Sequence, residues 1–250
     1  MRRITFILLI TLLLSACSSA QVKRYGIRVV NEYPHDRTAF TQGLFFHDGR
    51  LYETTGEYGE SSLRIVDLKS GNTTSRLDFD RRYFVEGSTV MGGELYILTW
   101  MNNVAFRYDP TTLEYKSSSR YPRQGWGLTT DGRRLIASDG TSTLRFLDNK
   151  LKVTGELKVT IQGKPLRNLN ELEWIDGRIW ANVWMTDTIV IINPSSGNVE
   201  ATIDCTGLLP SSLRRSDTDV LNGIATHSGR IYLTGKRWPR LYEIELVHIP

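Results

Sequence analysis

The sequence predicts an all-β fold: a five-bladed β-propeller with four-stranded antiparallel blades, its ring closed by pairing of the N- and C-terminal strands. Three observations support this prediction. Five similar segments recur at regular spacing, each contains a tight-turn signal, and one strand-like run is left over at each end of the chain. Helical periodicity is absent after the first sixteen residues, and 250 residues suffice for one such domain.

Each of the five segments places a turn dipeptide between two runs rich in Leu, Ile, Val, Tyr and Trp. Aligned on the turn, they are TQGLFFHDGRLYETTG, VEGSTVMGGELYILTW, GWGLTTDGRRLIASDG, LNELEWIDGRIWANVW and LNGIATHSGRIYLTGK. Their turn glycines, Gly49, Gly93, Gly132, Gly177 and Gly229, are 44, 39, 45 and 52 residues apart. Glycine supplies the positive φ that a two-residue hairpin turn needs, so each segment predicts a tight β-hairpin.

Two further strand-like runs follow each of the first four hairpins, for example SLRIVDL and NTTSRLDF after the first. Four strands in roughly 40–45 residues match the length of a propeller blade. After the fifth hairpin only RLYEIEL remains, whereas GIRVVNEYP (26–34) precedes the first hairpin. Pairing these two runs would close the ring and cover an exposed edge. The alternative is an irregular β-sandwich whose hairpins resemble one another by accident.

The N-terminus has the features of an export signal. Met1-Arg2-Arg3 precedes the apolar run Ile4–Leu14, which is too short to span a bilayer. The run leads into Leu14-Ser15-Ala16-Cys17, which resembles a bacterial lipoprotein processing site. We therefore expect Cys17 to be lipidated and the protein to be periplasmic, anchored to the outer membrane; ordinary cleavage, with Cys17 incidental, is the alternative. The expected organisation is a signal peptide over residues 1–16, a tether over 17–24 and a propeller domain over 25–250.

Composition excludes several classes of function. The chain has 31 Lys and Arg against 27 Asp and Glu, and loss of Arg2 and Arg3 would leave 29 basic residues. Without a basic stripe, nucleic acid is not an expected partner. Cys205 is then the remaining cysteine, expected to be a buried apolar residue rather than half of a disulfide. The four histidines lack metal-ligand spacing, so we expect no metal and no cofactor. No interface pattern is evident, and a monomer is expected.

The ends of the predicted hairpin strands carry polar and aromatic residues. In a propeller, the start of each blade's first strand and the end of its second strand lie on the same face. Six residues before the turn stand Gln42, Glu86, Asn170 and Asn222, with Trp126 in the corresponding place of the third segment. Seven residues after the turn glycine stand Gly56, Trp100, Asp139, Trp184 and Lys236. We therefore expect a carboxylate, an ammonium, three amides and three indoles at one mouth of the central channel.

Each of these residues also has a structural interpretation. A lone tryptophan on a strand is usually core, but three at one level indicate an aromatic-walled pocket. A carboxylate in such a pocket should have a raised pKa, so Glu86 is either catalytic or half of a structural ion pair with Lys236. Asn222 is expected to cap backbone groups between blades, and Asp139 to form a turn. The segment from Leu208 to Asp219 is expected to be a loop near the mouth.

The same residues resemble those of the plant and bacterial glutaminyl-peptide cyclotransferases. The matching stretches are FTQG (40–43), YFVEG (83–87), GWG (125–127), LNELE (169–173), WANVW (180–184), DVLNGIA (219–225) and TGK (234–236). The resemblance extends from about Tyr33 to Leu246. At Val85 this chain departs from the small residue usual in that family.

This resemblance implies an enzyme that converts the N-terminal glutamine of peptides or proteins to pyroglutamate, releases ammonia and needs no zinc. It further implies that Glu86 is the acid/base. The residues implied to bind substrate are Phe40, Gln42, Phe84, Trp100, Trp126, Asn170, Trp184 and Lys236. Two alternatives remain from the residues themselves. One is a non-catalytic propeller that binds a peptide terminus or a saccharide in the aromatic mouth, and the more distant one is a structural envelope protein.

Overall fold

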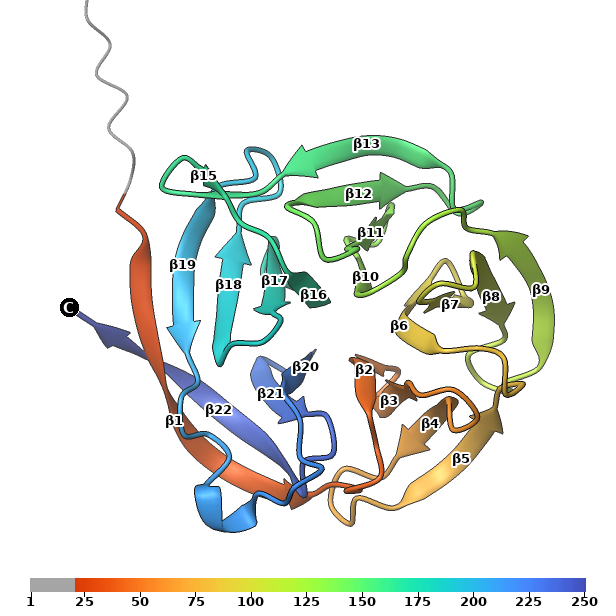
Figure 1. The fold of residues 1–250 in the computed structure, drawn as a ribbon, viewed down its shortest axis with the longest axis horizontal. Helices are drawn as coiled ribbons and strands as arrows, with labels where there is room; N and C mark the ends of the chain where they lie inside the picture. The colour runs from red at the N-terminus through yellow and green to blue at the C-terminus, as the bar shows by residue number, and fades with distance from the viewer. Residues whose placement is uncertain (1–20) are drawn as a thin grey trace, which may run out of the picture.

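The computed structural model describes residues 21–250, which fold into β-sheets arranged around a central axis (Figure 1). Three of the sheets contain four antiparallel strands each, in chain order from the centre outward. The first comprises β2 (Thr41–His47), β3 (Arg50–Thr55), β4 (Ser62–Val66) and β5 (Thr73–Asp78). The second comprises β6 (Val85–Met91), β7 (Glu94–Thr99), β8 (Val104–Tyr108) and β9 (Tyr115–Arg120). The third comprises β10 (Leu128–Thr130), β11 (Leu135–Ala137), β12 (Thr143–Leu147) and β13 (Val153–Lys158).

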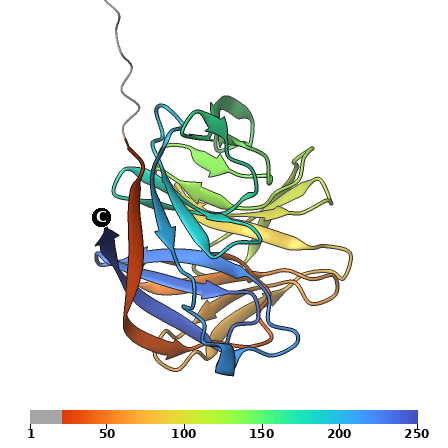
Figure 2. The same ribbon diagram turned by 60° about the vertical axis from the view of Figure 1, so that its left-hand side comes forward.

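The remaining long strands form one mixed sheet of eight strands. In spatial order these are β16 (Leu169–Ile175), β17 (Arg178–Val183), β18 (Thr188–Ile192), β19 (Val199–Asp204), β1 (Lys23–Pro34), β22 (Arg240–Ile249), β21 (Arg230–Gly235) and β20 (Leu221–His227). The terminal strands β1 and β22 pair antiparallel, as predicted, and run side by side in Figures 1 and 2. The parallel pairing of β1 with β19, which joins two groups of four strands, was not predicted.

Smaller differences from the sequence prediction lie in the connections. Strand β1 begins at Lys23, inside the segment assigned to the tether. A two-stranded ribbon of β14 (Thr160–Ile161) and β15 (Lys164–Pro165) was not predicted, nor was the 3₁₀ helix η1 (Ser211–Leu213). Across residues 21–250, no helix has the length and apolar character needed to cross a bilayer. The predicted signal peptide and Cys17 lie outside the described residues.

Four of the five hairpin turns have the predicted geometry, with both turn residues at positive φ. Examples are Asp48 and Gly49, at 48° and 73°. The third turn is different because the Asp131 carboxylate accepts hydrogen bonds from the backbone N–H groups of Arg133 and Arg134, at 3.0 and 2.9 Å. This side-chain turn replaces the two-residue turn and leaves β10 and β11 with three residues each.

The innermost strands pack closely around the axis. Contacts join β2 to β6, β6 to β10, β10 to β16, β16 to β20 and β20 back to β2. Glycine permits this approach: the Gly87 N–H donates to the Trp126 carbonyl at 2.7 Å, and a Cβ on Gly87 would collide with the backbone of the third sheet. Apolar side chains fill the space between neighbouring sheets, including the mid-strand residues Tyr52, Tyr96 and Trp180. The inner strands are therefore tightly packed against one another around the axis.

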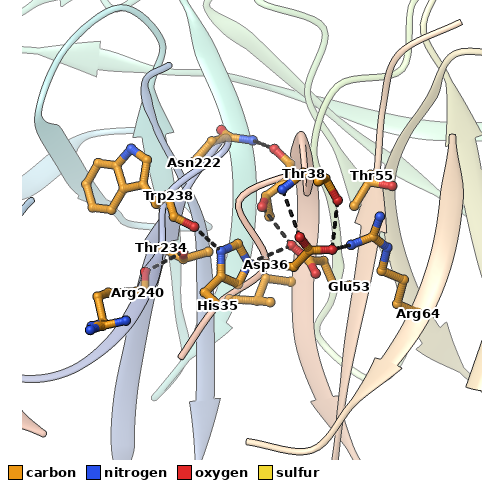
Figure 3. Close-up of polar contacts among 12 residues, drawn as sticks. His35, Asp36, Thr38, Glu53, Thr55, Arg64, Asn222, Thr234, Trp238 and Arg240 are labelled. Atoms are coloured by element: carbon orange, nitrogen blue, oxygen red, sulfur yellow. Dashed lines mark hydrogen bonds and ion pairs between the residues drawn. The ribbon is translucent and has the colours of Figure 1, made fainter. Parts of the chain in front are cut away.

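A buried polar network joins the first sheet to the turn between β21 and β22 (Figure 3). His35 lies between the Glu53 carboxylate, at 2.9 Å from Nε2, and the Trp238 carbonyl, at 2.7 Å from Nδ1. Burial lowers the pKa of His35, but the charge of Glu53 and these two contacts outweigh it, so the pKa is raised overall. Thr41 Oγ1 also donates to Glu53, at 2.7 Å. The network therefore holds the Trp238 carbonyl, two residues after Lys236.

Candidate active site

The first-strand residues at the mouth sit at irregularities of their strands. The ladders of β2, β6, β16 and β20 each shift register at the predicted position. The residues at these shifts are Gln42, Glu86, Asn170 and Asn222. A β-bulge takes its extra residue out of the ladder and redirects its side chain. The third sheet has no such register shift at its mouth residue, because Trp126 precedes β10. The Trp126 N–H instead donates to the Ser138 carbonyl at 3.1 Å.

Backbone hydrogen bonds bring the ends of the second strands beside these positions. Trp100 donates to the Phe84 carbonyl at 2.9 Å, and Trp184 to the Asn168 carbonyl at 2.8 Å. Lys236 donates to the Val220 carbonyl, also at 2.9 Å. The predicted convergence of the strand ends is therefore present in the structure.

These strand ends enclose a cavity of about 270 Å³. All nine residues predicted for the site line it: Phe40, Gln42, Phe84, Glu86, Trp100, Trp126, Asn170, Trp184 and Lys236. Two further lining residues, Met185 and Asp219, were missed. Met185 lies one residue beyond the strand end, and Asp219 ends the segment to which no role was assigned. A search of the residues flanking each strand end would have found both.

Two other strand-end residues have the structural roles predicted for them. Asn222 Nδ2 donates to the Thr41 carbonyl of the neighbouring sheet at 2.9 Å. The Asp139 carboxylate accepts hydrogen bonds from the N–H and hydroxyl of Thr141, at 3.1 and 2.6 Å, and so forms a turn. Neither residue lines the cavity.

Glu86 is the buried acid of the cavity, with 5% of its surface exposed. Gln42 Nε2 donates to its Oε1 at 3.3 Å. Burial raises the pKa of Glu86 well above 4.5, and the charge of Lys236 offsets part of that rise. Among the described residues no salt bridge joins Glu86 to Lys236, although the charge of each acts on the pKa of the other. The carboxyl group faces the cavity and is available to a ligand.

Lys236 presents its ammonium group to the same cavity. Its Nζ lies 4.6 Å from the centroid of the Phe40 ring, in a cation–π geometry. Burial lowers the pKa of Lys236, while the carboxylates of Glu86, Asp219 and Glu57 partly restore it. A lysine held in this way can donate hydrogen bonds to an oxygen atom inside the cavity.

A glutamine side chain holds two of the indoles that wall the cavity. Gln124 Oε1 accepts hydrogen bonds from Trp100 Nε1 at 3.1 Å and from Trp126 Nε1 at 3.0 Å. Trp126 in turn packs edge-to-face on Trp184, with ring centroids 5.5 Å apart. Gln124 was not predicted, because it lies in a connection outside the repeated hairpins. Its contacts fix the shape of the aromatic walls.

Two buried carboxyl groups tie the inner strands together below the cavity. Glu171, next to Asn170, accepts hydrogen bonds from the backbone N–H groups of Leu44 and Ile224, at 3.2 and 2.9 Å. Glu173 accepts from the Thr226 N–H at 3.2 Å. Burial raises the pKa of Glu171 well above 4.5 and that of Glu173 to about 8. These contacts connect β16 to β2 and β20.

Cys205 is buried, as predicted, and burial raises the pKa of its thiol to about 12. Within residues 21–250, no group of three or more His, Cys, Asp or Glu side chains is positioned to hold a metal ion.

The fold and the cavity define an all-β, propeller-like protein with an aromatic-walled pocket around a buried carboxyl group. A sequence model described as glutamine cyclotransferase matches residues 4–246, and the chain belongs to that family. It is 45% identical over 229 residues to a glutaminyl-peptide cyclotransferase of Arabidopsis thaliana, an alignment covering 88% of this chain and 71% of the relative. The crystal structure of Myxococcus xanthus glutaminyl cyclase superimposes with a TM-score of 0.86 at 34% identity, covering 92% of this chain and all of that one. The resemblance noted in the sequence is confirmed.

Proposed function

We propose that this protein is a glutaminyl-peptide cyclotransferase, which converts the N-terminal glutamine of peptides and proteins to pyroglutamate and releases ammonia. The observation that carries the proposal is Glu86, a buried carboxyl group facing a small cavity walled by three indoles. Family membership and the two relatives support it independently.

The reaction is an intramolecular ring closure. The substrate's α-amine attacks the carbon of its own γ-carboxamide, a five-membered lactam forms, and the C–N bond to the departing ammonia breaks. Well-oriented intramolecular reactions reach high effective molarities, so no covalent enzyme intermediate is needed. The protein has to hold the glutaminyl residue in a folded conformation, exclude water and move protons.

Glu86 is assigned the proton transfers. Its ionised form accepts a proton from the attacking amine, and its protonated form returns one to the leaving ammonia. Burial raises the pKa of Glu86 and the charge of Lys236 opposes that rise, an environment that suits a carboxyl group which both accepts and returns a proton. One carboxyl group can therefore serve both steps.

Three polar side chains are assigned to the γ-carboxamide. Gln42, Asn170 and Lys236 line the cavity together with Glu86 and can donate hydrogen bonds to the carboxamide oxygen. Negative charge develops on that oxygen during attack, and a preorganised donor of this kind is typically worth about 3 kcal/mol. The indoles and Phe84 provide the apolar walls for the side-chain methylenes.

We also infer that the sheets form five propeller blades. In this interpretation β16–β19 are the fourth blade, and β20–β22 with β1 are the fifth. The contacts among the innermost strands, which run from β2 through β6, β10, β16 and β20 back to β2, support a closed ring. The pairing of β1 with β22 would then be its closure.

Export is part of the proposal and rests on the sequence of the first seventeen residues. We propose that residues 1–16 are a signal peptide, that Cys17 is lipidated and that the monomeric enzyme is anchored to the outer membrane on its periplasmic side. Labelling of the full chain with a radioactive fatty acid in a bacterial host should mark the wild-type protein but not Cys17→Ala. Equal labelling of the two proteins would contradict this assignment.

The test of the activity is a mass measurement on a peptide that begins with glutamine. The enzyme should remove the mass of one ammonia from this peptide and leave unchanged the same peptide acetylated at its N-terminus, because the acetylated amine cannot attack. A chelator should not reduce the rate. Binding of the peptide without any change in its mass would favour the alternative of a non-catalytic binding protein.

A further inference from the structure

A second hollow lies directly beside the cavity. Its volume is about 250 Å³, and its lining residues are Met185, Thr186, Asp187, Arg214, Thr218, Asp219 and Val220. Met185 and Asp219 line both the hollow and the cavity that contains Glu86. The two spaces therefore meet at this pair of residues, between the turn that follows β17 and the segment that follows η1.

We propose that this second hollow binds the part of the substrate that follows the N-terminal glutamine. The inference rests on the proposed function, which places the glutaminyl residue beside Glu86. A peptide held there has to leave the cavity at its mouth, and an extended chain advances about 3.3 Å per residue. A chain that leaves between Met185 and Asp219 places its second and third residues in the hollow.

The backbone at Met185 supports a role in binding. Met185 has a φ of 67°, in the left-handed region that residues other than glycine rarely adopt. Its surface is 64% exposed. Thr186 stabilises this turn through two hydrogen bonds to the Val183 carbonyl, at 3.1 Å from its N–H and 2.6 Å from its hydroxyl. An exposed apolar side chain on strained backbone adds little to folding stability, whereas it offers a flexible contact for substrates of varied sequence.

Arg214 supplies the polar part of this subsite. Its side chain lines the hollow, and the structure shows no ion pair for it among residues 21–250. A guanidinium group carries five N–H donors. An extended peptide presents one carbonyl acceptor per residue, so Arg214 can bind the substrate backbone whatever side chains follow the glutamine. The ligand class is therefore the peptide backbone rather than one particular second residue.

The test compares two substrates of different length. L-Glutaminamide fills only the cavity, whereas Gln-Ala-Ala-amide also reaches the hollow. The wild-type enzyme should show a higher kcat/KM for the longer substrate. Arg214→Ala should lower kcat/KM for Gln-Ala-Ala-amide about threefold to tenfold, the range expected for one lost hydrogen bond. Its kcat/KM for L-glutaminamide should stay within about twofold of wild type, the scatter expected for a surface substitution.

The matched control is Arg215→Ala, which removes the neighbouring exposed guanidinium that does not line the hollow. It should leave both substrates unaffected. Equal losses on the two substrates in Arg214→Ala, or no loss on either, would overturn the subsite. If the wild-type enzyme cyclised neither substrate, the proposed function itself would fall and the subsite with it.

Discussion

Glu86→Gln keeps the size of the side chain but removes the group that moves protons. The amide oxygen at this position can still accept the hydrogen bond from Gln42. In the wild-type chain this bond joins Gln42 Nε2 to Glu86 Oε1 at 3.3 Å. General acid–base help from one side chain is typically worth about 10²–10⁴ in rate, or about 3–5 kcal/mol. We therefore expect kcat to fall at least about a hundredfold. KM should change little, because the aromatic walls of the cavity are untouched.

The assay is the initial rate of ammonia release from Gln-Ala-Ala-amide, measured over a series of buffers from acid to alkaline pH. Below the raised pKa of Glu86 the carboxyl group is protonated and cannot accept a proton, so the wild-type kcat should fall toward acid. The variant should lose this dependence. Glu60→Gln is the matched control, because Glu60 is an exposed carboxylate that does not line the cavity. Near-normal turnover in folded Glu86→Gln would refute the assignment.

Three further predictions concern the groups around Glu86. Lys236→Met should lower kcat about a hundredfold, because it removes a hydrogen-bond donor to the carboxamide oxygen. It should also move the acidic fall in rate to higher pH, because the charge of Lys236 lowers the pKa of Glu86 in the wild type. An unmoved pH profile would argue against this coupling. Gln124→Met removes the acceptor shared by two indoles and should raise KM about tenfold and alter tryptophan fluorescence, whereas Gln124→Glu, which keeps an acceptor oxygen, should preserve both. Glu173 has a folded-state pKa of about 8, above its ordinary 4.5, so it stabilises the fold at low pH and loses that contribution as pH rises toward 8. The contribution of Glu173 to the free energy of unfolding should therefore fall by about 1.4 kcal/mol per pH unit between pH 4.5 and about 8, and urea titrations of Glu173→Gln should show a shallower decline.

The repeat explains why so much of the site follows from the sequence. Strands of similar length separate each turn from the mouth, so a fixed offset from the turn glycine finds Glu86, Trp184 and Lys236. The glycines that follow Gln42 and Glu86 are part of the same repeat. They permit the close packing of the inner strands, and this packing brings the strand-end residues to one cavity.

Other features depend on side-chain contacts that a repeat does not encode. Asp131 builds a four-residue turn from its own carboxylate, although its dipeptide matches those of the other hairpins. Gln124 accepts a hydrogen bond from Trp100, 24 residues away, as well as from nearby Trp126, and Glu171 accepts from strands β2 and β20. No local pattern identifies these contacts. The parallel contact of β1 with β19 arises where the terminal strand meets its neighbour, which the spacing of the hairpins does not determine.

The most direct test of the proposed chemistry is a crystal structure of Glu86→Gln with a bound peptide that begins with glutamine. The glutaminyl side chain should lie between the indoles of Trp100, Trp126 and Trp184. Its α-amine and γ-carboxamide should both lie beside residue 86, with the carboxamide oxygen toward Lys236. A peptide bound with its N-terminal residue outside the cavity, or with its α-amine directed away from residue 86, would contradict the assignment of this cavity as the site of cyclisation.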